Sequence, residues 1–170
     1  CNRMSGAWDG LGHFERARNA AATGLAETAI TGDLRRMLQS NLANAHYTLW
    51  EHEEALALAT SLIEDAETAG DSERSRRTRA WSHYVRGHTY RRMIDLAPSS
   101  RRLYAELSRR DLAIAAEGWE ALATVAEDDS YGAIAQTCRG GMIEADVALG
   151  EIDASAALER MRSQLQARCG

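Results

Sequence analysis

The chain contains no lysine, so all 20 of its Lys/Arg positions are arginine. This usage is typical of a protein from a GC-rich genome. Its chemical consequence is that neither a P-loop lysine nor a Schiff-base lysine can come from this chain. Nucleotide hydrolysis of the P-loop type and lysine-based covalent catalysis are therefore excluded.

Proline and phenylalanine occur once each, and no apolar run approaches the roughly 20 residues that cross a bilayer. Alanine, leucine, glutamate and arginine are plentiful, which favours helix throughout. At 170 residues the chain can bury a core as one domain. The sequence thus predicts a single all-α domain over residues 1–170.

Cysteine is scarce and its spacing carries no motif. Cys1, Cys138 and Cys169 are odd in number and far apart, which argues against a disulfide framework and against structural zinc. A start at Cys1 in place of methionine has two interpretations: a fragment of a longer protein, which we favour, or a mature bacterial lipoprotein acylated at Cys1. We expect a cytoplasmic protein, with the membrane-anchored lipoprotein as the alternative.

Residues 11–33 and 49–71 repeat the same residue types at the same spacing. The matched pairs are Leu11 and Leu49, Glu15 and Glu53, Ala17 and Ala55, Ala21 and Ala59, and Gly32-Asp33 and Gly70-Asp71. A fixed period in the thirties is typical of helical hairpins that bury their apolar faces against their neighbours. Each Gly-Asp pair predicts a left-handed glycine that ends one helix, followed by an aspartate that caps the next.

The apolar periodicity predicts about seven helices in three to three and a half antiparallel hairpins, a helical solenoid. Their expected ranges are 12–31, 33–49, 49–71, 71–96, a fifth helix capped by Ser99 or Ser100, 131–149 ended by Gly150, and a last helix to about 168. Pro98 ends the fourth helix near Leu96. Residues 1–10 are a truncated helix or a disordered lead, and about twenty extra residues around 95–110 lengthen the third repeat or add a loop.

Four stripes are expected to face the core. The third helix should bury Ala55, Leu58, Ala59, Leu62, Ile63, Ala66 and Ala69. The fifth should bury Leu112, Ala115, Ala116, Trp119, Leu122, Ala123 and Ala126. The sixth should bury Tyr131, Ile134, Ala135, Cys138, Met142, Ala145, Ala148 and Leu149, and the last Ala154, Leu158, Met161 and Leu165.

These features resemble the tetratricopeptide repeat, in the longer-period form of kinesin light chains and bacterial peptide-sensing regulators. The matching segments are Leu11-Gly12-x-Phe14-x-x-Ala17, Asn41-Leu42-Ala43 with Glu53-Glu54-Ala55-Leu56, and Leu149-Gly150-Glu151-Ile152. The chain departs from the family at Trp50, where glycine is usual, at His46, where tyrosine is usual, and at Ser155, where alanine is expected. The resemblance implies a concave groove that binds peptides or partner proteins.

In that family an asparagine of the first helix often holds the backbone of an extended peptide. Asn41 and Asn44, with Met37 and Thr48, form one stripe that fits this role; ordinary solvated side chains are the alternative. Trp81, Tyr84, His88 and Arg91 recur at helical spacing on the fourth expected helix, 71–96, and suit peptide recognition, with core packing of Trp81 and Tyr84 as the alternative. The expected groove residues are Asn41, Asn44, Thr48, Trp81, Tyr84, His88 and Arg91.

Charge is distributed unevenly. Residues 72–110 hold eleven arginines against Glu73, Asp95 and Glu106, a balance of +8 in a chain of net charge −5. Such a region could attract an acidic peptide, a carboxylate or a phosphate. It could equally pair with acidic neighbours such as Glu64, Asp65 and Glu67. Nucleic acid is not expected, because the pI is about 5.6.

Signals for catalysis are weak. Residues 136–140, QTCRG, resemble the caspase nucleophile motif, with His88 about fifty residues upstream. Cys138, however, lies on a helical apolar stripe, which favours an inert buried thiol. We therefore expect no enzyme, metal or cofactor, but a scaffold that binds a protein or peptide, an acidic one being favoured by the arginines. The alternatives are a ligand- or peptide-sensing module of a larger regulatory protein and a structural subunit of an assembly, and oligomerisation stays open.

Overall fold

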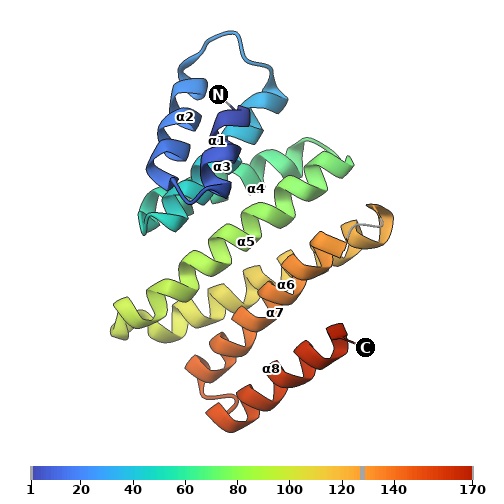
Figure 1. The fold of residues 1–170 in the computed structure, drawn as a ribbon. Helices are drawn as coiled ribbons and strands as arrows, with labels where there is room; N and C mark the ends of the chain where they lie inside the picture. The colour runs from blue at the N-terminus through green and yellow to red at the C-terminus, as the bar shows by residue number, and fades with distance from the viewer. Residues whose placement is uncertain (1, 127–128, 170) are drawn as a thin grey trace. The chain divides into compact units, whose positions relative to one another are not determined.

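The computed structural model describes residues 2–126 and 129–169, so Cys1 and its proposed acylation lie outside the described residues. Within these ranges every element is helical, which confirms the all-α class (Figure 1). The elements are α1 (Asn2–Gly10), α2 (Phe14–Ala26), α3 (Gly32–Thr48), α4 (His52–Thr68), α5 (Glu73–Leu96), the 3-10 turn η1 (Pro98–Ser100), α6 (Arg101–Ala126), α7 (Asp129–Leu149) and α8 (Ala154–Cys169). Of the two alternatives for the first ten residues, a truncated helix or a disordered lead, the structure shows a helix, α1. None of the described helices has the length and apolar character needed to cross a bilayer.

Packing divides the chain into two compact units, unit 1 (Cys1–Val85) and unit 2 (Arg86–Gly170). The division falls inside α5, whereas the sequence predicts one domain over residues 1–170. Unit 1 contains α1 to α4 and the first half of α5, and unit 2 contains the rest. Each unit is described by itself below.

Three hairpin turns share one hydrogen-bonding pattern. Gly12, Trp50 and Gly150 all have positive φ angles, of 75°, 66° and 76°. In each turn this residue donates its N–H to the carbonyl three residues back, and the next residue donates to the carbonyl five residues back, at 2.8–3.2 Å. This is the Schellman ending of a helix, which requires a left-handed residue. The turns join α1 to α2, α3 to α4, and α7 to α8, so the repeated segments correspond to repeated turns.

Trp50 is the exception among these turn residues. Glycine adopts a left-handed conformation without strain, whereas a residue with a Cβ does not. Trp50 nevertheless takes this conformation at the position where the resembled family has glycine, and its side chain is 58% exposed. The backbone of the turn is therefore retained despite the substitution.

The junctions between hairpins confirm a left-handed glycine at Gly70, but the prediction is wrong for Gly32, which has no positive φ and begins α3, and for both aspartate caps. Gly70 has φ +80° and follows the end of α4. The cap of α5 is Ser72, whose Oγ accepts from the Ser75 N–H at 3.1 Å, and not Asp71. Likewise Thr31 caps α3 by accepting from the Leu34 N–H at 3.3 Å, so α3 already includes Gly32 and Asp33. In both cases a neighbouring hydroxyl residue, Thr31 before Asp33 and Ser72 after Asp71, takes the capping position and leaves the aspartate side chain available for other contacts.

The core of unit 1 joins α3, α4 and the first half of α5. Ala43, Ala59, Leu62 and Val85 are buried together, with Tyr47, Leu58, Trp81 and Tyr84 packed partly buried around them. Most of the predicted α4 stripe is buried, although Ala69 at its end is exposed. The small residues of this core allow neighbouring helices to approach closely.

The core of unit 2 is centred on Leu112 of α6, which is fully buried. A Cβ at Gly87 of α5 would lie 2.8 Å from Leu112 Cγ, and one at Gly141 of α7 would lie 2.6 Å from Leu112 Cδ1. Only glycine fits on either side of this leucine. Nearby, Asp111 is buried and receives two hydrogen bonds from Arg86, Nε to Oδ2 at 2.6 Å and Nη2 to Oδ1 at 3.0 Å.

The extra length of the third repeat lies in its helices. Helix α5 has 24 residues and α6 has 26, and the connection between them is the turn η1 around Pro98. Residues 101–110 are the first turns of α6. They extend a helix of unit 2 and do not form a separate loop.

The predicted inward face of the last helix is wrong. Leu158 and Leu165 of α8 are 65% and 66% exposed, whereas Ala157 is buried. Met161, which was also expected to face inward, is partly buried. A small residue at 157 lets the backbone of α8 lie closer to α7 than a leucine would. The helix is thus rotated relative to the expected stripe.

Candidate functional site

The predicted asparagine stripe lies on α3 in unit 1, and Asn44 is held in a defined orientation there. Its Nδ2 donates to both oxygens of Asp9 on α1, at 3.0 and 3.1 Å. Burial raises the pKa of Asp9 above its ordinary value, and the hydrogen bonds from Asn44 offset part of this increase. Among the residues whose side chains the structure describes, none donates to Asn44 Oδ1. The amide therefore keeps one acceptor for a ligand N–H.

The other predicted groove residues of unit 1 are partly exposed. Asn41 and Thr48 lie on the same side of α3 as Asn44, and the Thr48 hydroxyl donates to the Asn44 carbonyl at 2.8 Å. On α5, Trp81 and Tyr84 stack with ring centroids 5.0 Å apart and planes 13° apart. The two rings also pack against the unit 1 core, so core packing and an exposed edge coexist at these positions.

His88 and Arg91 belong to unit 2, and the structure places them differently from the prediction. His88 is only 4% exposed, and burial, together with the charges of Arg91 and Arg92, lowers its pKa to about 3. A ring in this position cannot touch a peptide at the surface. Arg91 forms an ion pair with Glu144 of α7. The predicted stripe along α5 is therefore divided between a partly exposed aromatic pair and a buried, ion-paired segment.

Most arginines of the basic region, residues 72–110, pair with carboxylates of the same chain. Arg74, Arg76, Arg86, Arg91, Arg101, Arg102, Arg109 and Arg110 have such partners. The partners are Asp33, Asp71, Asp95, Glu106, Asp111, Glu144, Asp146 and Glu151, and not the predicted Glu64, Asp65 and Glu67. The charge count of +8 thus overstates the attraction available to an acidic ligand.

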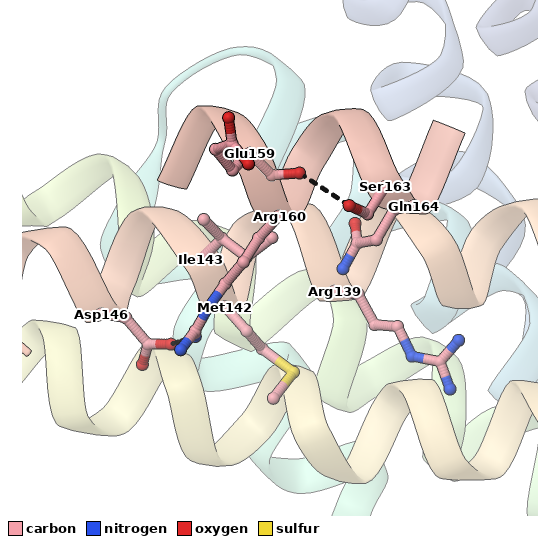
Figure 2. A pocket seen from close by; sticks show the side chains of 8 residues that line it. All are labelled: Arg139, Met142, Ile143, Asp146, Glu159, Arg160, Ser163 and Gln164. Atoms are coloured by element: carbon pink, nitrogen blue, oxygen red, sulfur yellow. Dashed lines mark hydrogen bonds and ion pairs between the residues drawn. The ribbon is translucent and has the colours of Figure 1, made fainter. Parts of the chain in front are cut away.

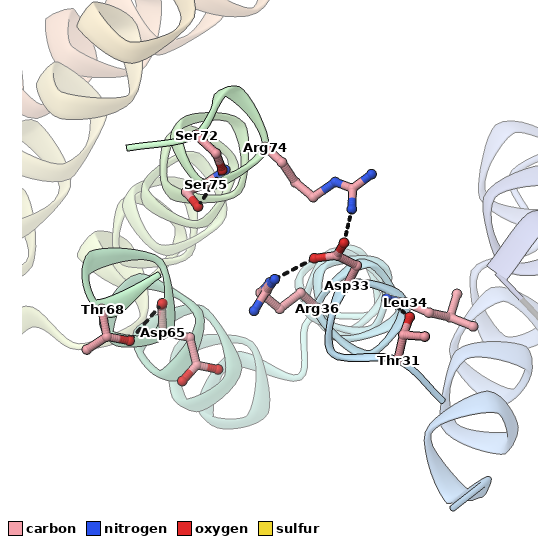
Figure 3. A network of polar contacts seen from close by, with 9 residues as sticks. All are labelled: Thr31, Asp33, Leu34, Arg36, Asp65, Thr68, Ser72, Arg74 and Ser75. Atoms are coloured by element: carbon pink, nitrogen blue, oxygen red, sulfur yellow. Dashed lines mark hydrogen bonds and ion pairs between the residues drawn. The ribbon is translucent and has the colours of Figure 1, made fainter. Parts of the chain in front are cut away.

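One open cavity of unit 1 is lined by several arginines. It has a volume of about 530 Å³ and lies between the start of α3, the end of α4 and the start of α5. Asp33 bridges two of the arginines: Oδ1 receives Arg36 Nη2 at 2.5 Å, and Oδ2 receives Arg74 (Figure 3). Arg77 lines the same cavity, and the described residues provide no carboxylate within ion-pair distance of it. Arginine clusters of this kind bind carboxylates and phosphates.

A second cavity, of about 480 Å³, lies between α7 and α8 in unit 2. Met142 and Ile143 of α7 form its apolar part, and Arg160 of α8 pairs with Asp146 at 3.4 Å (Figure 2). Arg139 at its edge pairs with Glu120 of α6. The charged groups of this cavity are thus largely compensated, and it resembles an incompletely filled contact between two helices.

Cys138 lies in the interior of unit 2 and is fully buried. Burial raises the pKa of its thiol to about 12. At neutral pH the sulfur is therefore protonated and poorly nucleophilic. No strand lies beneath it in the described part of the chain.

Comparison of the chain with protein-family models, with curated proteins and with solved structures gives no match. The resemblance to the tetratricopeptide repeat therefore depends on the residues and turns described above.

Two groups of the site were not predicted from the sequence. Asp9 was not singled out, because nothing in residues 1–10 indicates that its carboxylate meets an asparagine 35 positions later. Nor does the sequence indicate that Arg36, which lies outside residues 72–110, pairs with the same carboxylate as Arg74, that of Asp33. The long-range contacts across α1, α3 and α5 bring these residues together.

Proposed function

We propose that this chain is a tetratricopeptide-like scaffold that binds a protein or peptide and performs no chemistry of its own. The observation that carries the proposal is the Asn44 amide, whose nitrogen is held by Asp9 while its oxygen faces no donor of the described residues. An amide held in this way loses little conformational entropy when it accepts a backbone N–H of an extended peptide.

Two further features support the proposal. The Schellman turns at Gly12, Trp50 and Gly150 repeat the same hairpin geometry. The stacked Trp81 and Tyr84 rings, both partly exposed, provide the amphipathic aromatic surface that peptide-binding sites favour. The preference for an acidic peptide is weakened, because most arginines of the basic region have internal partners.

The test begins by selecting peptides from a random display library on the full chain and measuring their affinity by fluorescence anisotropy. Asn44→Ala should weaken binding about three- to ten-fold, the effect of one neutral hydrogen bond. Asp9→Ala should have a smaller effect in the same direction, because it frees the amide to rotate. Asn19→Ala is the matched control, since Asn19 is an exposed asparagine on α2.

The proposal fails if no peptide is selected, or if Asn44→Ala and Asn19→Ala behave alike while both variants keep the wild-type circular dichroism spectrum. A diffusible ligand that raises the melting temperature, without any peptide binding, would instead support the sensing module. Self-association of the free chain would support the structural subunit.

A further inference from the structure

The cavity formed by Asp33, Arg36, Arg74 and Arg77 differs from the peptide-binding face in its chemistry. Its residues come from the start of α3 and the start of α5, all within unit 1. Arg36, on α3 with Asp33, and Arg74, on α5, both point toward the Asp33 carboxylate (Figure 3). Two guanidinium groups from separate helices thus converge on one anionic group.

The Asp33 carboxylate occupies the place that an external anion would take. Each of its two oxygens accepts from a different arginine, as in a carboxylate or phosphate bound by an arginine cluster. The Arg74 pair is exposed and the Arg36 pair is half-buried: the relative accessibility is 47% for the Asp33 side chain, 31% for Arg36 and 51% for Arg74. Ion pairs at such exposure contribute little to stability, so Asp33 can rotate away at low cost.

A third arginine makes the cavity suitable for more charge than one carboxylate carries. Arg77 lines the same space, and the described residues provide no carboxylate partner for it. Glu73 also lies in the wall and opposes an anion there. Three guanidinium groups against these two carboxylates leave an excess of one positive charge, and displacement of Asp33 increases the positive potential that a ligand meets.

From this arrangement we infer that the cavity is a phosphate-binding site in which Asp33 is an internal competitor for the arginines. A phosphate group carries about −1.5 to −2 charges and three acceptor oxygens, so it can engage Arg36, Arg74 and Arg77 together. Asp33, with one charge and two acceptors, satisfies only two of them. The group is a free phosphate or the phosphate of a phosphorylated segment, since both present the same oxygens.

The site is tested on the full chain by NMR, with the arginine Nε–Hε signals followed during titration with sodium phosphate, and with sodium chloride at matched ionic strength. Saturable binding of phosphate but not of chloride is expected. Arg77→Gln should weaken it about five-fold, and Asp33→Asn should strengthen it by a similar factor. Arg35→Gln is the matched control, because Arg35 is an exposed arginine next to Arg36 that does not line the cavity.

A second titration uses a short phosphoserine peptide and its unphosphorylated form. Tighter binding of the phosphoserine peptide than of inorganic phosphate, with none of the unphosphorylated form, identifies a phosphorylated segment as the source. Equal or weaker binding identifies a free phosphate. The inference is overturned if phosphate and chloride act alike, if Arg35→Gln weakens binding as much as Arg77→Gln, or if Asp33→Asn does not strengthen it. Because no peptide-face residue is involved, this result is independent of the peptide-binding test.

Discussion

Adding one methyl group at Gly141 should destabilise unit 2, whereas the same change at the neighbouring Gly140 should stabilise it. A Cβ at Gly141 would lie 2.6 Å from Leu112 Cδ1 and 3.1 Å from His88 Cε1, and both neighbours are buried. Leu112 cannot move away, because Gly87 on its other side leaves equally little space. A Cβ at Gly140 would meet nothing within 4 Å.

The magnitudes follow from two opposing effects. Replacing glycine by alanine inside a helix stabilises by about 0.5–1 kcal/mol, because glycine loses more conformational freedom on folding. Overfilling a packed core costs about 1–3 kcal/mol. Gly140→Ala shows only the first effect, so the free energy of unfolding should rise by about 0.5–1 kcal/mol. Gly141→Ala shows both effects, so its free energy of unfolding should fall by their difference, up to about 2.5 kcal/mol.

The assay is urea unfolding of each variant, followed by circular dichroism at constant pH and salt. A double variant with Leu112→Ala tests the cause, because the smaller side chain at 112 removes the clash. Gly141→Ala should then cost less in the Leu112→Ala background than in the wild type. If Gly141→Ala stabilises the protein as much as Gly140→Ala does, the close packing of α5, α6 and α7 around Leu112 is wrong.

Three further outcomes can be checked with the same unfolding assay. The pKa of His88 is lowered from 6.5 to about 3, so the unfolded chain binds this proton at a higher pH than the folded chain does. The free energy of unfolding should therefore decrease as the pH falls from 6.5 toward 3, by at most about 1.4 kcal/mol per pH unit. His88→Leu should flatten this dependence of stability on pH. Asp111→Ala should lower the free energy of unfolding by about 3–5 kcal/mol, because it leaves the largely buried Arg86 without its carboxylate. Asp71→Ala removes an exposed ion pair and should change the free energy of unfolding by less than about 1 kcal/mol. Trp50→Gly should be more stable than Trp50→Ala by about 1 kcal/mol, the reverse of the order inside a helix, because a Cβ is strained at φ 66°.

The turns show how local chemistry predicts local structure. Gly150 indicates the end of a helix, because a Schellman ending depends only on a left-handed residue and on carbonyls within one helical turn. The structure confirms this ending, and it shows the same ending at Gly12, where the sequence predicted the start of a helix, and at Trp50, where the residue type argues against it. The repeat of the hairpins therefore predicts the positions of the turns better than the residue type at any single position does.

The last helix shows where periodicity is insufficient. In helix α8 the predicted stripe consists of Ala154, Leu158, Met161 and Leu165, and an overlapping stripe contains Ala157 and Met161. The larger side chains made the first stripe the better candidate for burial, yet Ala157 is buried and both leucines are exposed. The choice between the stripes depends on the surface of α7, which the sequence of α8 does not contain.

The predicted groove illustrates the same limit for function. Residue spacing placed Asn41, Asn44 and Thr48 on one side of α3, as the structure has them. The same reasoning placed His88 with Trp81 and Tyr84, although His88 is buried. A helix carrying aromatic and charged residues on several sides can be covered on any of them, and only the neighbouring helices decide which.

The sequence by itself determined the helices, most of their ends and the repeat of the hairpin turns, because these depend on hydrogen bonds and dihedral angles within a few residues of one another. The tertiary structure alone decided which carboxylate each arginine meets, which face of α8 is buried, and that Asp9 orients Asn44. Such contacts join residues tens of positions apart, and many alternative pairings satisfy the same charges and periodicities. Their selection follows from the packing of whole helices, in which small differences such as a glycine beside Leu112 set how closely the backbones approach.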